Sequence, residues 1–255
     1  MRSFFDLTER FPISIDVSRL RDELDQMENL DWSRHYDVTQ PSGWTTILLR
    51  SINGSIDGPE SMRHGRFDEY KNTPLLERFP HMREVVDAFQ CPIGRVRLSK
   101  MAPHMAINAH RDIGEEVASI AFGQVRLHIP ITTNDKVFFY VGKEKLQMAP
   151  GRLYYVDFAK VHSVRNDGDE SRVHLFLELK VNDWLNALFP KFTPIEQVDM
   201  ALQRIYLPVF WKLLKLWMYD RRVHKLRKMY EASVLQVLWR WIRDRTGLRN
   251  PVGPS

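Results

Sequence analysis

The sequence predicts a mainly β protein in which helices flank an antiparallel barrel or sandwich. Between residues 93 and 181, apolar and polar residues alternate in short runs, which is typical of strands with one buried face. Turn residues such as Pro150-Gly151 separate these runs, and no helical pattern intervenes. Strands without intervening helices favour antiparallel connections. Helical periodicity is found before and after this region.

The N-terminal part predicts helices, one strand and a long loop. Residues 15–30 place apolar side chains at helical spacing, and "TTILL" (45–49) is a short apolar run typical of a strand. Residues 51–73 are polar and contain three glycines, which indicates a long loop. This loop is either a lid or a solvated connection, and we favour the lid. Residues 73–89 have a helical pattern that Pro80 is expected to interrupt.

Five segments of the central region have strand patterns. They are "GRVRLSKM" (94–101), "VRLHIPI" (125–131), "KVFFYV" (136–141), "RLYYVDF" (152–158) and "RVHLFLELKV" (172–181). In the first, Arg97, Ser99 and Met101 share one face, and in the second Arg126 and His128 do so. Polar side chains inside a small barrel are costly unless they are paired or serve a site. We therefore expect an electropositive interior that suits an anionic ligand.

Charge is concentrated in the C-terminal part of the chain. Residues 195–255 hold twelve Lys or Arg and five Asp or Glu, whereas the rest is close to neutral. A near-neutral body is not typical of a nucleic-acid-binding protein. The single Cys91 excludes an internal disulfide framework and favours a reducing compartment. Because we find no signal-peptide pattern and no long apolar stretch, we expect a cytoplasmic protein.

The central region also carries a set of metal-ligating residue types. His110 and Asp112 lie two residues apart, His162 follows 52 residues after His110, and Arg172 lies ten residues further on. A His-x-Asp pair by itself is common in loops. Two histidines and one carboxylate on an antiparallel barrel, however, are what a facial iron(II) site needs. A nearby arginine can bind a carboxylate through two charge-assisted hydrogen bonds.

These segments resemble a known enzyme family. "AHRDIG" (109–114), "VRLHIPI" and "GRLYYVDFAKVHSVRNDGDESRVHLFLEL" (151–179) are similar to the aspartyl/asparaginyl β-hydroxylase family of Fe(II)/2-oxoglutarate-dependent dioxygenases, in particular to its stand-alone bacterial branch that includes proline cis-4-hydroxylase. The resemblance implies a double-stranded β-helix (jelly-roll, cupin-like) catalytic core over 93–182. Residues 1–92 would complete the barrel, and 183–255 would form a basic amphipathic helical region.

The resemblance also implies the cofactor and the roles of nine residues. Fe(II) would be the metal, with 2-oxoglutarate and O2 as cosubstrates. The implied catalytic metal ligands are His110, Asp112 and His162; the implied 2-oxoglutarate contacts are Arg172, Ser99, His128 and Met101; the candidate substrate contacts are Arg97 and Arg126.

Several of these residues have alternative interpretations. Arg126 could equally form a structural ion pair, and His128 could simply pack in the interior. His174 is expected to be a satisfied interior histidine rather than an alternative ligand. Asp157 is the competing carboxylate, and we expect it to have a structural role.

The predicted activity is hydroxylation of an unactivated C–H bond in a small anionic metabolite such as an amino acid, with release of succinate and CO2. The alternatives are the same chemistry on a peptidyl, carrier-bound or lipid substrate, and a non-hydroxylating cupin-like binding protein. The tail, with "LPVFWKLLKLWMYDRRVHKLRKMY" (207–230), is basic, amphipathic and rich in aromatic residues. It either packs on the barrel or across a homodimer, which we favour, or lies peripherally on an anionic membrane.

Overall fold

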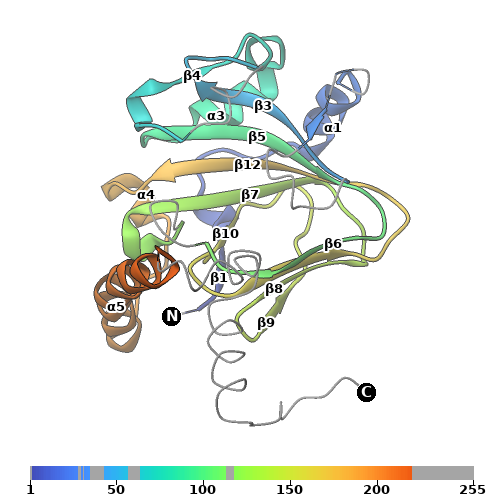
Figure 1. Cartoon of the computed structure of the whole chain (residues 1–255). Coiled ribbons are helices and arrows are strands. Elements are labelled where there is room, and N and C mark those ends of the chain that lie inside the picture. Colours follow the sequence, from blue (N-terminus) through green and yellow to red (C-terminus); the bar gives the residue numbers. More distant parts are fainter. Residues whose placement is uncertain are drawn as a thin grey trace.

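Two antiparallel sheets form the core of the protein in the computed structural model, which describes residues 2–27, 30, 32–34, 43–56, 64–112 and 118–219 (Figure 1). The large sheet has the order β1-β10-β7-β12-β5-β3-β2, with β4 also paired to β3, and the small sheet has the order β6-β11-β8-β9. The strands are β1 (Phe4–Asp6), β2 (Ser33–Arg34), β3 (Trp44–Ile52), β4 (Tyr70–Asn72), β5 (Ile93–Met101), β6 (Met105–His110), β7 (Gln124–Thr132), β8 (Val137–Val141), β9 (Glu144–Leu146), β10 (Tyr154–Val156), β11 (His162–Asn166) and β12 (Arg172–Lys180). This arrangement confirms the predicted jelly-roll class.

Helices contact the outside of the large sheet and extend from its end. They are α1 (Val17–Asp25), α3 (Pro80–Asp87), α4 (Asp183–Ala187) and α5 (Pro194–Tyr219), with short 3-10 turns η1 (Thr8–Arg10), η2 (Phe67–Glu69), η3 (Leu76–Arg78) and η5 (Ile120–Phe122). Helix α1 contacts both α3 and β7, and α5 lies apart from these helices beside η5 (Figure 1). The buried Glu23 of α1 accepts hydrogen bonds from the backbone N–H groups of His81 and Met82, at 2.7 and 2.9 Å. It thereby satisfies free donors in the first turn of α3.

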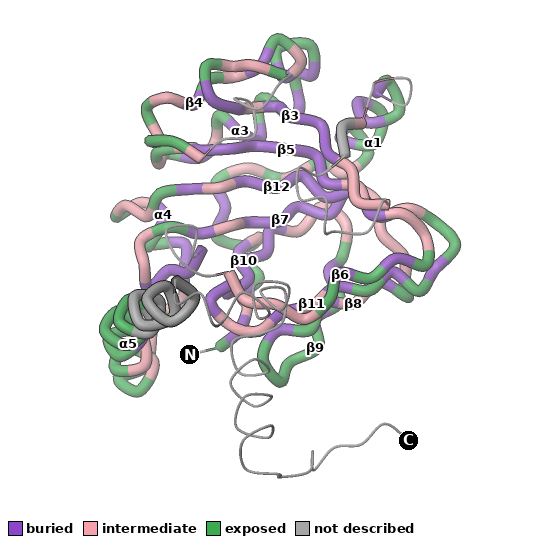
Figure 2. Tube along the Cα trace, in the orientation of Figure 1, coloured by how far each residue is buried: buried purple, intermediate pink, exposed green. Residues whose placement is uncertain are grey.

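The outer face of the large sheet is apolar and belongs to the main hydrophobic core. Strands β5, β12 and β7 are buried along most of their length (Figure 2). Their outward side chains pack with helix residues such as Leu20 and Met82. The outward side chains are Val96, Leu98, Val125, Leu127, Ile129, Val173, Leu175, Leu177 and Leu179. This face holds the helices against the sheet by burial of apolar area.

The inner face of the same three strands is largely polar. In the antiparallel register His174 lies opposite Ser99, Phe176 lies between Arg97 and His128, and Glu178 lies opposite Arg126. The second hydrophobic cluster, which includes Met101, Phe139, Tyr154, Phe158 and Val164, draws on both sheets. The predicted alternation therefore separates an apolar outer face from a polar inner face.

Three predicted elements differ from the structure. The segment 51–73 was expected to be a loop, but its last residues form β4, which pairs with β3; residues 57–63 lie outside the described part of the chain. Pro80 begins α3 instead of interrupting a helix, because proline is compatible with the first helical position, where its missing N–H has no partner to lose. Helix α1 ends at Asp25, before residue 30.

Within the described residues, no helix has the length and apolar character needed to cross a bilayer.

Candidate metal centre

The pairing of β6 with β11 brings two histidines together. His162 is the direct register partner of His110, and their ring centroids lie 4.1 Å apart. Asp112 follows β6, and its backbone N–H donates to the carbonyl of Phe158 at 3.2 Å. One ligand atom from each of His110, Asp112 and His162 lies within 4.8 Å of the others. The three predicted metal ligands therefore form one cluster, although His162 follows His110 by 52 residues in the chain.

Both imidazoles present the same nitrogen to this cluster. Nδ1 of His110 lies 2.8 Å from the carbonyl oxygen of Asn108, and Nδ1 of His162 lies 3.0 Å from that of Lys160. Because a carbonyl oxygen can only accept, each Nδ1 carries the hydrogen and each Nε2 keeps its lone pair. Each Nε2 lies 3.9 Å from Oδ1 of Asp112. Metal-binding histidines have this orientation, with the second nitrogen held by a hydrogen bond.

The protonation state of His162 also suits a ligand. Burial lowers the pKa of His162 to about 4, even though the carboxylate of Asp112 acts in the opposite direction. The imidazole is therefore neutral near pH 7, and only the neutral form has a free electron pair for a metal.

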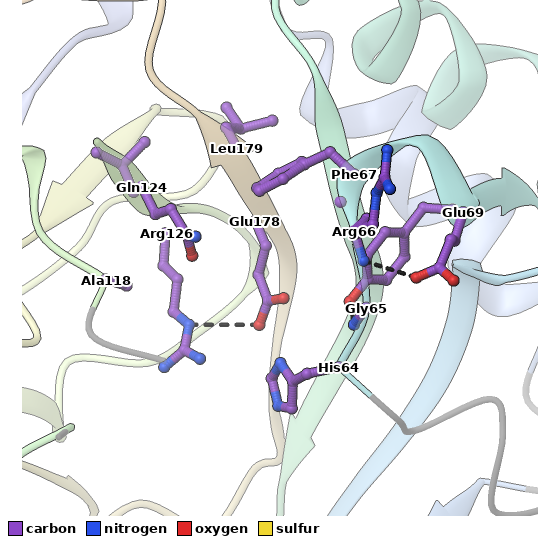
Figure 3. Close-up of a pocket in the computed structure, with 13 residues that line it drawn as sticks. His64, Gly65, Arg66, Phe67, Glu69, Ala118, Gln124, Arg126, Glu178 and Leu179 are labelled. Atoms are coloured by element: carbon purple, nitrogen blue, oxygen red, sulfur yellow. Dashed lines mark hydrogen bonds and ion pairs between the residues drawn. The ribbon is translucent and has the colours of Figure 1, made fainter. Parts of the chain in front are cut away.

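Asp112 is oriented by a chain of ion pairs. Arg126 donates from Nη1 to Oδ2 of Asp112, and its Nε lies 3.3 Å from Oε1 of Glu178 (Figure 3). Because Oδ2 accepts from Arg126, Oδ1 is the oxygen that faces the two imidazoles. Arg126 thus determines which carboxylate oxygen is presented to the cluster.

Glu178 is a site residue that the sequence reasoning missed. Burial acts to raise the pKa of Glu178, but the positive charges of Arg126, Arg95 and Arg97 outweigh it, so the pKa lies below its ordinary value. The carboxylate is therefore ionised and balances part of the arginine charge. The sequence could have indicated this residue, because Glu178 lies on the same face as Arg172 in the alternating segment 172–181.

Arg172 lies on the inner face of β12 and is buried with its charge uncompensated. Its side chain is 3% exposed, and Nε and Nη1 have no hydrogen-bond partner among the residues that the structure describes. Burial and the neighbouring charge of Arg97 lower the pKa of Arg172 to about 9. Met101 is its register partner and is fully buried, and Ser99 accepts a hydrogen bond from Nε1 of Trp44 at 2.9 Å.

Two further histidines lie beside Arg172. The Nδ1 atoms of His128 and His174 are 3.3 Å apart, so one donates and the other accepts. Burial, and after it the charge of Arg172, lowers the pKa of both rings well below the ordinary value. Nε2 of each ring has no partner within the described ranges. His174, expected to be a satisfied interior residue, therefore satisfies only one of its two nitrogens.

These orphaned atoms test whether an acidic cosubstrate fits the site. An unsatisfied buried donor or acceptor costs about 1–3 kcal/mol, and a charged one costs more. Here Arg172, His128 and His174 place four such atoms on one polar face. Three of these atoms are donors, namely Nε and Nη1 of Arg172 and one imidazole Nε2, and a dicarboxylate offers acceptor oxygens for them and the missing negative charge. The residues therefore fit 2-oxoglutarate.

The remaining candidate residues lie in other environments. The guanidinium carbon of Arg97 lies 4.5 Å from the ring centroid of Phe176, in a cation–π contact. Asp157 is buried outside the metal cluster, accepts from the backbone N–H of Ala159 at 3.2 Å, and has its pKa raised to about 6 by burial. His104 lies at the surface, 3.0 Å from Asp169.

A cavity of about 420 Å³ is linked to the cluster through Arg126, whereas the three candidate ligands are not among the residues that line it. Gly65, Phe67 and Glu69 line one side of it, and Gln124, Arg126 and Glu178 line the other (Figure 3). Arg126 therefore touches both the cavity and the candidate ligand Asp112. This is the place where a second molecule could meet the metal centre.

Comparison with protein families decides the relationship. The model of the family described as Aspartyl/Asparaginyl beta-hydroxylase matches residues 15–182. The chain belongs to this family. The resemblance seen in the motifs is thereby confirmed. Together with the His-Asp-His cluster, the membership identifies an Fe(II)- and 2-oxoglutarate-dependent dioxygenase.

Several solved structures are similar to this chain. A prolyl-4-hydroxylase from Pseudomonas putida has 9% identity and a TM-score of 0.44, covering 71% of this chain and 94% of that one. HygX from Streptomyces hygroscopicus, solved with nickel and 2-oxoglutarate, has 10% identity and a TM-score of 0.43, covering 71% and 84%. A 2OG-Fe(II) oxygenase family oxidoreductase from Burkholderia pseudomallei has 14% identity and a TM-score of 0.39, covering 65% and 78%. No curated protein matches the sequence.

Proposed function

We propose that this dioxygenase hydroxylates an unactivated C–H bond of a small anionic metabolite such as an amino acid, with release of succinate and CO2. One observation carries the proposal: the inner face of the large sheet gathers four arginines, one of which, Arg126, donates to the candidate metal ligand Asp112. Arg95 and Arg97 lie on β5, Arg126 on β7 and Arg172 on β12. Nε and Nη1 of Arg172 have no partner in the described part of the chain, so this face has a buried cation that favours anions.

In this proposal His110, Asp112 and His162 would hold Fe(II). When bound, Fe(II) with 2-oxoglutarate and O2 supplies the oxidising power that protein side chains lack. Arg172 binds the distal carboxylate of 2-oxoglutarate, with Ser99, His128 and Met101 around it. The hydrogen bonds from His110 and His162 to backbone carbonyls keep both rings in the ligating orientation.

Substrate recognition in this proposal depends on the cavity beside the cluster. Its volume of about 420 Å³ lies in the usual range for sites that take small molecules. Arg126 lines this cavity and also contacts Asp112, so an anion bound by Arg126 lies close to the metal. Arg97, the second candidate for a substrate carboxylate, lies on β5 opposite Phe176. A substrate that carries a carboxylate would therefore be anchored at the arginine that also contacts Asp112.

The test is a panel of amino acids and other small carboxylates, each incubated with the purified protein, Fe(II) and 2-oxoglutarate. Succinate release is measured together with a mass gain of one oxygen in the candidate substrate. We expect at least one carboxylate to stimulate succinate release, whereas its matched amine without the carboxylate does not. Stimulation by peptides, carrier-bound acyl groups or lipids alone would favour the larger-substrate alternative. Tight binding without turnover of any compound would favour a cupin-like binding protein.

A further inference from the structure

Helix α5 carries a row of exposed apolar side chains. Eight large hydrophobic residues are conspicuously exposed in the described part of the chain, and six of them lie on this one helix. The six are between 48% and 81% exposed: Ile195, Val198, Leu202, Ile205, Tyr206 and Val209. Their spacing of mostly three and four residues places them along one side of the helix. A contiguous apolar row in water indicates a contact surface.

The opposite side of α5 attaches the helix to the body of the protein. Gln203 is buried, Met200 packs against the main core, and Arg204 donates from Nε to the carbonyl of Ala121 in η5. The backbone N–H of Arg2 donates to Glu196 at 3.3 Å. The helix is therefore anchored through one side, and its apolar row is left facing the solvent (Figure 2).

The charge of the following sequence indicates what the row contacts. Residues 212–228 contain seven Lys or Arg and one Asp, and aromatic residues are frequent from 206 to 219. Apolar rows next to basic sequence, with Trp and Tyr, are typical of helices that lie in the interface of anionic membranes. A second copy of the chain would bring the same positive charges and repel it, whereas an anionic surface complements them.

We propose that α5 is a docking surface for an anionic lipid bilayer. The apolar row enters the boundary between headgroups and acyl chains, and the positive charge of the following sequence strengthens the attraction to acidic headgroups. The helix lies on the membrane and does not cross it, since no helix among the described residues is long and apolar enough to span a bilayer.

Docking through α5 also positions the cavity. Arg204 holds η5 at Ala121, three residues after Ala118, which lines the cavity, and five before Arg126. The membrane-facing helix is thus fixed to the segment that borders the candidate substrate site. This inference does not depend on the proposed substrate, because its test measures lipid binding and not turnover.

The experiment compares three full-length proteins by co-sedimentation with vesicles. Wild type is compared with the double variant Leu202→Gln/Ile205→Gln, which removes the centre of the row, and with Ala201→Gln, which changes an exposed residue of α5 outside the row. The vesicles are phosphatidylglycerol mixed equally with phosphatidylcholine, or phosphatidylcholine alone. We expect wild type and Ala201→Gln to bind the anionic vesicles in a salt-sensitive way. The double variant should bind these vesicles with an affinity at least about tenfold lower.

Wild type that stays in solution with anionic vesicles would overturn the proposal, as would equal binding by the double variant. A lipid-free wild type that is dimeric in sedimentation equilibrium, with a monomeric double variant, would also overturn it in favour of a second copy. Equal thermal unfolding of the three proteins shows that the comparison concerns the surface alone. Val198→Gln/Val209→Gln replaces the double variant if that one unfolds, because it alters the same row at other exposed positions.

Discussion

The two faces of strands β5, β12 and β7 differ in what they contribute. Leu98, Leu175 and Leu127 on the outer face are fully buried in the main core, where each such side chain stabilises the fold by about 1.5–3 kcal/mol. On the inner face, Arg172 and His174 are equally buried but carry orphaned polar atoms, which cost free energy. Neighbouring residues of one strand therefore differ in their effect on stability. The outer face stabilises the fold, whereas the inner face forms the candidate site and lowers the stability of the fold.

The largest effect on the inner face is expected at the metal cluster. His162→Ala removes one of the three candidate ligands, so we expect loss of both Fe(II) binding and succinate formation, with little loss of stability. Metal content per folded protein and 2-oxoglutarate turnover are the measurements, and His104→Ala, a surface substitution, is the control. Iron stoichiometry equal to wild type in His162→Ala would refute the assignment of the cluster.

The outer face should show the reverse behaviour. Leu175→Ala creates a cavity in the main core, and we expect the free energy of unfolding to fall by about 2–5 kcal/mol. The metal cluster lies on the other side of the sheet, so Fe(II) binding by the folded fraction should persist. Urea unfolding followed by circular dichroism measures the loss. A variant that keeps its stability but no longer binds metal would contradict the separation of the two faces.

Arg172→Met tests whether one inner-face residue supports binding of 2-oxoglutarate without stabilising the fold. We expect the KM for 2-oxoglutarate to rise about a hundredfold, because a buried charge-assisted contact is lost. Fe(II) should still bind, and the free energy of unfolding of the apoprotein should not fall, because the buried cation has orphaned nitrogens in the described structure. Steady-state kinetics and urea unfolding check the two effects. An unchanged KM would remove Arg172 from the 2-oxoglutarate site.

Glu178→Gln tests the ion-pair chain at the cavity. The neutral amide holds Arg126 less firmly, so we expect the KM of the primary substrate to rise about tenfold while that of 2-oxoglutarate stays unchanged. Glu178→Asp, which retains the charge, should recover part of the loss. Equal changes in both KM values would indicate a general disturbance of the sheet rather than a role at the cavity.

The smallest effect concerns the pH dependence of stability. The pKa of His174 is lowered well below 6.5, so the folded state keeps this ring neutral while the unfolded chain takes up a proton. The stability that it contributes is present above about pH 6.5 and is lost as the pH falls, by at most about 1.4 kcal/mol per pH unit. In the apoprotein, His174→Phe should flatten this slope below pH 6.5. A slope as steep as that of wild type would contradict it.

Long alternating segments could be predicted from the sequence, and short strands could not. Strands β5, β7 and β12 each have nine residues, enough for the alternation to be visible, and they carry most of the candidate cosubstrate residues. Strands β6 and β11 have six and five residues, and their polar and apolar residues are mixed. The sequence therefore predicted no strand around His110, although its pairing with His162 across these strands creates the cluster.

Two other features depend on tertiary context that a sequence does not contain. The role of Glu178 comes from three arginines on two different strands, and only the register between them brings the charges together. The amphipathic character of α5 was predicted, and our preference for packing on the barrel or across a dimer over a membrane contact stays a prediction. In the described part of α5, Met200, Gln203 and Arg204 contact the body, and the apolar row faces outward.

The position of Arg126 between Asp112 and the cavity has a thermodynamic consequence. In the proposed function, a substrate anion competes with Asp112 for Nη1 of Arg126 while Glu178 holds the same guanidinium through Nε, and a metal ion would withdraw charge from Asp112. Substrate and metal therefore change each other's affinity, and by reciprocity they do so by the same factor. Through Arg126 alone, the metal affinity of the site would therefore depend on whether substrate is bound.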